Sequence, residues 1–218
     1  MESSVKMKSG VAQHYERLFE RYPNLECMRK PIMAAFDIMR QSYQQGKKVM
    51  TCGNGGSAAD AEHIVGELMK GFYLSRKIKN PPLEGLQGAL PAIALTQHTA
   101  LATAIINDTD ASLIFAQQVY GYGQDGDVLV CISTSGNAEN VIKAAITAGA
   151  MGVKVVGMTG SGNVPGGKLA EYCDVLLVVP ADVTADIQEL HLPVYHTLCA
   201  MLEGEFFGDL NYLGENES

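Results

Sequence analysis

Five short, continuously apolar runs recur along the chain and constrain its fold more than any other feature. Turn-forming residues bound each run, and helical patterns separate one run from the next. Strands that are apolar on both faces are typical of a parallel sheet covered by helices on both sides. We therefore expect an α/β fold, a doubly wound five-stranded parallel sheet flanked by helices. The runs lie at residues 48–52, 91–96, 127–133, 153–159 and 174–180.

Helical patterns also occur outside the sheet region. Two N-terminal helices are expected at about residues 10–22 and 31–45, packing on the domain edge or on another subunit. A last helix is expected to begin near Thr184. Pro193 lies in its interior and should kink or divide it, because proline removes a backbone donor and crowds the preceding turn.

The chain of 218 residues has room for one α/β domain. The segment between Phe72 and Pro91 is rich in turn formers and predicts a mobile surface excursion near a pocket or an interface. We expect the tail to be disordered. The expected organisation is an N-terminal helical segment at 1–46, the α/β domain at 47–207 and the tail at 208–218.

Composition excludes several classes of function. Acidic residues outnumber basic ones, 24 to 16, without a basic run, which argues against nucleic-acid binding. No apolar run is long enough for a membrane helix, so no membrane association is expected. The N-terminal residues lack the apolar centre of a secretory signal, which indicates a cytoplasmic protein. Five cysteines without paired spacing argue against a disulfide framework and a cysteine-cluster metal site.

The stretch GNGGSA, Gly53–Ala58, follows the first expected strand and precedes a helix. It fits a dinucleotide-binding pattern, but position 73 is Tyr where an acid should bind the ribose, and the lysine of a phosphate-binding loop is absent. The function that remains for this turn is the binding of an anion by its backbone N–H groups. Ser57 would then either contact the ligand or cap the next helix, with Asp60 completing a capping pair. Both interpretations stay open.

A second polar turn, STSGN, lies at Ser133–Asn137, after the third expected strand. Open parallel sheets bind ligands at the carboxyl ends of their strands. Backbone donors and three hydroxyls could hold a phosphoryl group without a nearby cation. A helix cap at Asn137 would explain one of these residues but not all of them.

His63 and Glu67 are four residues apart on the helix that follows the first turn, so they share one face. Such a pair is ordinarily a surface ion pair. His63 nevertheless lies about 9 Å along the helix axis from Ser57, where a sugar phosphate anchored at the turn would place its far carbons. The last helix adds further candidates whose spacing does not choose among them: Gln188, Glu189, His191 and His196.

With these motifs assembled, the chain resembles the sugar isomerase (SIS) family and, within it, the phosphoheptose isomerases. The similarity extends from about Gly46 to Glu203. Its motifs are CGNGGSAADAEHIVGEL, PAIALT with INDTD, GDVLVCISTSGNAENVIKAA, GVKVVGMTG with GGKLAEYCD, and IQELHLPVYH.

This resemblance implies conversion of D-sedoheptulose 7-phosphate to D-glycero-D-manno-heptose 7-phosphate through an enediolate. It implies Glu67 as the base, His196 as the acid, and a homotetramer with active sites at subunit contacts. It also implies a Zn²⁺ ion held by His63, Glu67, Gln188 and His196. The implied substrate-binding residues are Asn54, Gly55, Gly56, Ser57, Asp108, Ser133, Thr134, Ser135 and Gln188.

The chain departs from the family pattern at several places. Ala138 and Gly71 stand where a serine and an arginine are frequent, Asp186 replaces a frequent arginine, and the Tyr73–Ala89 loop is longer than usual. These differences bear on the identity of the sugar more than on the reaction. Two alternatives therefore stay open: an isomerase of another ketose phosphate, and a non-catalytic SIS protein that binds phosphosugars or a replication or regulatory protein.

Overall fold

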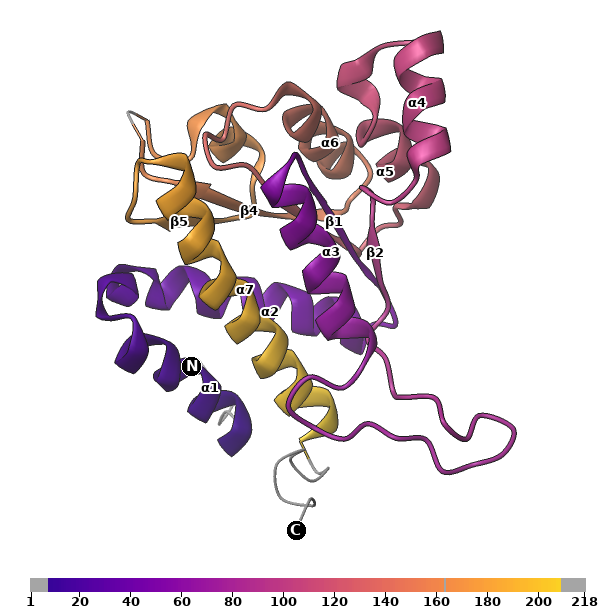
Figure 1. The fold of residues 1–218 in the computed structure, drawn as a ribbon, viewed down its shortest axis with the longest axis vertical. Coiled ribbons are helices and arrows are strands. Elements are labelled where there is room, and N and C mark those ends of the chain that lie inside the picture. Colours follow the sequence, from indigo (N-terminus) through magenta and orange to yellow (C-terminus); the bar gives the residue numbers. More distant parts are fainter. Residues whose placement is uncertain (1–7, 163, 209–218) are drawn as a thin grey trace.

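The computed structural model describes residues 8–162 and 164–208 (Figure 1). Its five strands form one parallel sheet in the order β2-β1-β3-β4-β5. The predicted parallel α/β fold is confirmed. The strands are β1 Val49–Gly53, β2 Ala92–Ala94, β3 Val128–Ile132, β4 Lys154–Gly160 and β5 Val175–Val179.

Seven α-helices accompany the sheet in the described residues, with 3-10 turns at Pro23–Met28, Ala111–Leu113 and Gly167–Tyr172. Figure 1 shows how these helices cover the two faces of the sheet. The α-helices are α1 Ser9–Arg21, α2 Arg29–Gln44, α3 Gly56–Met69, α4 Thr99–Asp108, α5 Ala116–Tyr122, α6 Glu139–Ala150 and α7 Thr184–Phe207.

Two hydrophobic clusters, one on each face of the sheet, make up the core. Alternate residues of a strand point to opposite faces. Val128, Val130 and Ile132 of β3 accordingly join the cluster formed with α1, α2, α3 and α7. Leu129 and Cys131 join the other cluster, with α5 and α6. This double coverage explains why the strand sequences are apolar without alternation.

The register of the central strands brings the two polar turns together. β1 pairs with β3 from Val49 opposite Val128 to Gly53 opposite Ile132. Both strands therefore end at the same edge of the sheet. The turn after Gly53 and the turn after Ile132 are neighbours in space, although they are far apart in the sequence.

Pro193 does not divide the last helix, because α7 continues from Thr184 to Phe207. Of the two predicted effects, a kink or a division, the division is wrong. The helix packs against α1, α2 and α3, and Val194, Tyr195 and Leu198 beside the proline are buried. The burial of this apolar surface outweighs the hydrogen bond that proline removes.

The N-terminal helices pack on the body of the chain. α1 lies along α7, and α2 contacts both α7 and the sheet. The division into three segments at residues 46 and 207 stays a prediction, and the predicted disordered tail, 208–218, lies outside the described residues except for Gly208. None of the described helices combines the length and the hydropathy that crossing a membrane requires.

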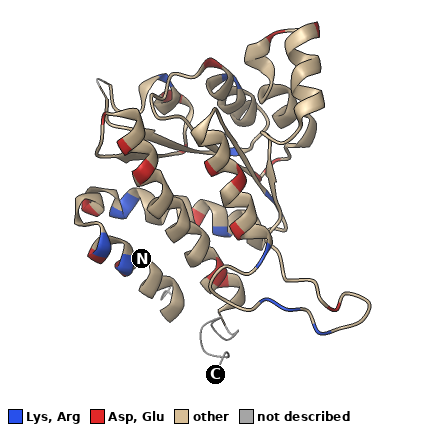
Figure 2. Cartoon of the chain, in the orientation of Figure 1, with Lys and Arg blue, Asp and Glu red and all other residues tan. Residues whose placement is uncertain are grey.

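The segment between α3 and β2 folds back on itself as an arm that extends from the body (Figure 1). Lys77 pairs with Gln87 in an antiparallel bridge. The base of the arm is anchored where buried Arg76 contacts Glu203 of α7, with 2.7 Å between Nε and Oε1. Figure 2 shows further basic residues along the arm.

Candidate active site

A cavity of about 140 Å³ lies where β1 and β3 end. It brings together polar side chains from both turns that sequence analysis assigned to phosphate binding. The amides of Asn54 and Asn140 also link the first turn to the start of α6, because each Nδ2 donates to the other's Oδ1 at 2.9 Å. The cavity is lined by Asn54, Ser57, Ile132, Ser133, Thr134, Ser135 and Ala138.

The first turn depends on its glycines. Gly55 is the N-cap of α3 with φ +56°, a conformation that side chains disfavour. A Cβ on Gly56 would lie 2.1 Å from Nε2 of Gln188, so α7 approaches the turn closely. Ser57 is not the cap, and Asp60 does not complete a capping pair, so that interpretation is wrong. Ser57 is instead a buried residue that lines the cavity.

The second turn is packed against the chain after β4. Gly136 has φ +63°, and a Cβ there would lie 1.9 Å from the carbonyl oxygen of Gly166. Asn137 does not cap α6, whose N-cap is Ala138. Its amide donates to the Ser135 carbonyl at 2.8 Å and accepts from the backbone N–H of Lys168 at 3.2 Å. Asn137 thus stabilises the turn that presents the hydroxyls.

Three of the predicted metal ligands meet between α3 and α7. Nε2 of His63 lies 3.1 Å from Oε1 of Glu67 and 3.3 Å from Nε2 of His196. The other carboxylate oxygen of Glu67 accepts a hydrogen bond from Nζ of Lys70 at 3.2 Å. Glu67 is nearly buried, whereas His63 is partly open to solvent. A carboxylate and two imidazoles therefore share one small site, which we call the His63 cluster.

Two residues behind the His63 cluster orient it. The hydroxyl of Tyr195 donates to Oδ1 of Asp60 at 3.2 Å and lies 3.0 Å from Nδ1 of His63. A hydroxyl has one proton, so its oxygen accepts from His63 Nδ1–H when that proton goes to Asp60. The network assigns the His63 proton to Nδ1. In the neutral imidazole Nε2 then has a lone pair, which a metal ion between His63 and Glu67 would accept.

Burial governs the protonation of these groups. It raises the pKa of Asp60, and the hydrogen bond from Tyr195 opposes that shift. Burial also raises the pKa of the Tyr195 hydroxyl, and the charge of Asp60 adds to the effect. The pKa of His196 is lowered, mainly by burial and further by His63. A neutral His196 can accept or donate a proton near neutral pH.

The fit of the His63 cluster to a metal ion depends on its donor atoms and on their spacing. In residues 8–162 and 164–208, no group of three or more histidine, cysteine, aspartate or glutamate side chains is arranged to hold one. In a tetrahedral zinc site, ligands about 2.0–2.1 Å from the metal lie about 3.3 Å from one another. The separations of His63 from Glu67 and His196, 3.1 and 3.3 Å, are close to that value. The donor types and these two separations fit zinc. The three side chains together, however, do not surround one position for the metal.

Two predicted residues lie apart from this cluster. Gln188 is eight residues before His196 on α7, and its amide packs against Gly56. It lines an open depression of about 320 Å³ with Asp60. Asp108, at the end of α4, is exposed and accepts a hydrogen bond from Asn107 at 2.7 Å. It does not line the cavity at the two turns.

Sequence reasoning assigned no role in the His63 cluster to Asp60 or Tyr195. The spacing of Asp60 and His63, three residues on one helix, could have indicated that they share a face. The position of Tyr195 carried no comparable signal, because its partners are more than 130 residues away. Lys70, which donates a hydrogen bond to Glu67, also had no assigned role, although it follows Glu67 by three residues.

Comparisons with known proteins identify the family of the chain. The model of the SIS domain family matches residues 15–160. A phosphoheptose isomerase from Clostridium acetobutylicum is 43% identical over 178 residues, 82% of this chain and 84% of that protein. Another, from Rhodospirillum rubrum, is 45% identical over 172 residues, 79% of this chain and 84% of that protein.

Solved structures show the same similarity in three dimensions. The phosphoheptose isomerase GmhA from Neisseria gonorrhoeae matches with a TM-score of 0.72 and 37% identity, covering 89% of this chain and 97% of that one. A phosphoheptose isomerase from Francisella tularensis matches with a TM-score of 0.73 and 34% identity, covering 88% and 95%. The chain belongs to the SIS domain family and, within it, to the phosphoheptose isomerases.

Proposed function

We propose that the protein converts D-sedoheptulose 7-phosphate to D-glycero-D-manno-heptose 7-phosphate. One observation carries the proposal: the His63 cluster and the hydroxyl-lined cavity both flank α3, which begins at the first turn. The family supports the same reaction, since relatives more than 40% identical to this chain over the aligned residues are named phosphoheptose isomerases. The protein is thus an aldose-ketose phosphate isomerase.

The reaction moves a carbonyl from C2 to C1 without changing the formula of the sugar. A base must take a proton from C1 and return it to C2, while a second group moves protons between the two oxygens. We assign the first task to the carboxylate of Glu67, which is nearly buried and accepts a hydrogen bond from Lys70. His196 suits the second task because the lowered pKa of its imidazole favours the neutral form.

Zn²⁺ is proposed as the cofactor, with His63, Glu67, Gln188 and His196 as the residues that would hold it. When bound, it would polarise the oxygens at the reacting end of the sugar. The hydrogen bond that His63 Nδ1–H donates to the Tyr195 hydroxyl supports this assignment, because it leaves Nε2 of the neutral imidazole free to bind a metal. Gln188 is the fourth ligand by resemblance alone.

The phosphate is proposed to bind in the cavity at the two turns. Ser57, Ser133, Thr134 and Ser135 offer four hydroxyls there, and backbone N–H groups add further donors. No lysine or arginine lines this cavity among the described residues, so uncharged donors would hold the anion. Asn54, Gly55, Gly56, Gln188 and Asp108 are proposed to complete the binding of the substrate.

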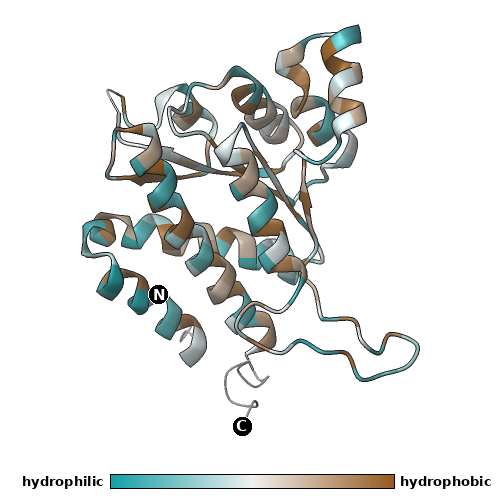
Figure 3. Ribbon diagram, viewed as in Figure 1, coloured by the Kyte–Doolittle hydropathy of each residue, from teal (hydrophilic) through white to brown (hydrophobic). Residues whose placement is uncertain are grey.

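A homotetramer is proposed as well. Exposed apolar side chains support it: Leu101 and Ile106 of α4 are 38% and 52% exposed, and Figure 3 shows hydrophobic residues among hydrophilic ones on this helix. Asp108 is on the same helix, so a neighbouring subunit could bring it to a site from which it is separate in one chain. The cytoplasmic location stays a prediction from the sequence.

The test is product analysis with a panel of ketose phosphates, with and without a chelator. We expect formation of the heptose 7-phosphate, loss of turnover on chelation and recovery with zinc. Glu67→Gln should lower kcat by about 10²–10⁴-fold. Glu62→Gln is the matched control, since Glu62 is exposed on the same helix and contacts Thr96. Near-normal turnover by Glu67→Gln would contradict the role of the base, and phosphosugar binding without turnover would contradict the reaction.

A further inference from the structure

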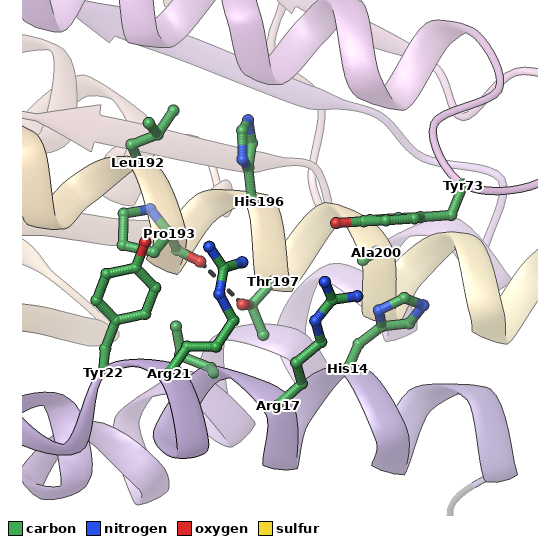
Figure 4. A pocket seen from close by; sticks show the side chains of 11 residues that line it. His14, Arg17, Arg21, Tyr22, Tyr73, Leu192, Pro193, His196, Thr197 and Ala200 are labelled. Atoms are coloured by element: carbon green, nitrogen blue, oxygen red, sulfur yellow. Dashed lines mark hydrogen bonds between the residues drawn. The ribbon is translucent and has the colours of Figure 1, made fainter.

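A separate cavity of about 150 Å³ lies between α1 and α7. Figure 4 shows the side chains that line it, with Arg17 and Arg21 extending from α1 toward α7. His14 of α1 and Tyr73, at the base of the arm, close one end, where their rings lie 4.9 Å apart. His196 lines the cavity from α7, so the cavity adjoins the His63 cluster.

The charged side chains that line this cavity are positive. Arg17 and Arg21 are one helical turn apart and lie on one face of α1. None of the eleven described residues that line the cavity is Asp or Glu. Within the described residues, neither arginine forms an ion pair. The remaining arginines of the chain, Arg29, Arg40 and Arg76, each pair with a carboxylate.

Two arginines without an ion pair are unexpected in an acidic chain, which has 24 acidic and 16 basic residues. Figure 2 shows acidic residues on the neighbouring helices α3 and α7. Two guanidinium groups placed together without carboxylates repel one another, and an anion between them removes that repulsion. An anionic ligand would supply the negative charge that the residues lining the cavity lack.

The chemistry of the cavity favours a phosphoryl group. Guanidinium groups present planar pairs of N–H donors that match the spacing of phosphoryl oxygens. The hydroxyl of Tyr22 lines the same space. The volume, about 150 Å³, exceeds the roughly 30 Å³ that one water molecule occupies in the liquid. A tetrahedral anion and a few waters therefore have room.

We propose that this cavity is a second phosphoryl-binding site, in which Arg17 and Arg21 hold the anion beside His196. It is distinct from the cavity at the two turns, and it does not depend on the proposed isomerase activity. The phosphoryl group has two sources. It belongs either to free phosphate or to the far end of a sugar phosphorylated at both ends, which would extend along α7 from Gln188 to His196, about 12 Å.

The first test is isothermal titration with inorganic phosphate. We expect two phosphate ions per subunit for the unchanged protein and one for Arg17→Gln/Arg21→Gln, with affinity at the lost site at least tenfold weaker. Ser133→Ala/Ser135→Ala should retain the arginine site and weaken the other. Lys30→Gln/Lys79→Gln is the control for net charge, because it removes two exposed cations elsewhere and should still bind two ions.

The arginine variant binding phosphate like the unchanged protein would overturn the proposal. So would a single site in the unchanged protein that Ser133→Ala/Ser135→Ala removes. Arg17 and Arg21 are exposed, so the variant should fold, and unchanged thermal unfolding checks this. The single substitutions Arg17→Gln and Arg21→Gln should each weaken phosphate binding less than the double substitution does.

The second test separates the two sources of the phosphoryl group. Fructose 6-phosphate and fructose 1,6-bisphosphate are titrated against protein saturated with phosphate. If a doubly phosphorylated sugar is the ligand, the bisphosphate displaces two ions per subunit and loses at least tenfold affinity in the arginine variant. If free phosphate is the ligand, each sugar displaces one. These are binding measurements, so an inactive enzyme would not affect their outcome.

Discussion

The buried ion pair between Arg76 and Glu203 should control the stability of the region beside the proposed active site. Glu203 accepts hydrogen bonds from the backbone N–H groups of Phe72, Tyr73 and Leu74 at 2.7 to 3.1 Å and from Nε of Arg76 at 2.7 Å. Its carboxylate is fully buried. The substitution Glu203→Gln retains the shape of the side chain but removes its charge.

The expected cost follows from what the substitution leaves behind. The guanidinium of Arg76 keeps the carbonyls of Leu68 and Glu67 as acceptors, at 2.8 and 3.3 Å, but loses its anion in a site that is 2% exposed. Breaking one partner of a buried pair costs about 3–5 kcal/mol, because the other charge remains uncompensated. For a chain of this size, that predicts a fall in Tm of about 6–20 °C.

The measurement is the free energy of unfolding from urea titration, together with Tm. Glu205→Gln, two residues further along α7, is the control and should change stability by less than about 0.5 kcal/mol. Arg76→Met should also destabilise, and the double variant should cost less than the sum of the two because the partners are coupled. A loss below about 1 kcal/mol for Glu203→Gln would refute the view that this carboxylate anchors the arm.

Three further outcomes are expected. Burial lowers the pKa of His191 to about 4, against about 6.5 when unfolded. The contribution of neutral His191 to the free energy of unfolding should therefore be full above pH 6.5 and fall by up to about 3 kcal/mol toward pH 4. Urea titrations at several pH values should show a weaker pH dependence for His191→Gln. Tyr195→Phe should weaken zinc binding by about 10–100-fold in calorimetric titration, because His63 loses its partner, while Tyr120→Phe on the surface should have no effect; equal affinities would contradict the orienting role. Gly136→Ala should destabilise by at least about 2 kcal/mol in thermal unfolding, because of its φ of +63° and the clash with Gly166, and an unchanged Tm would count against that packing.

The sheet could be predicted because its signal is local. Each strand is a short apolar run between turn residues, and the structure places the strands within two residues of the predicted positions. The last helix shows the limit of local signals. Proline predicts an interruption, but α7 packs against three helices, and burial of Tyr195 and its neighbours outweighs one lost hydrogen bond.

The candidate site was predictable only in part. His63 and Glu67 share a helix, so their contact follows from the 3.6-residue period. Their contact with His196 was implied by the family resemblance, and spacing alone did not choose it among the polar residues of α7. Gln188 shows what could not be predicted. The resemblance implies that it binds the metal with His63, but its amide lies against Gly56, apart from the His63 cluster.

The sequence by itself determined the class of fold, the two glycine- and serine-containing turns and the family. These depend on backbone preferences and on side chains that lie close together along the chain. Only the tertiary structure decided that Tyr195 bridges Asp60 and His63 across 132 to 135 positions, and that Arg17 and Arg21 border the cavity next to His196. The physical reason is that the direction in which one helix packs on another depends on the whole core, which no short stretch of sequence encodes.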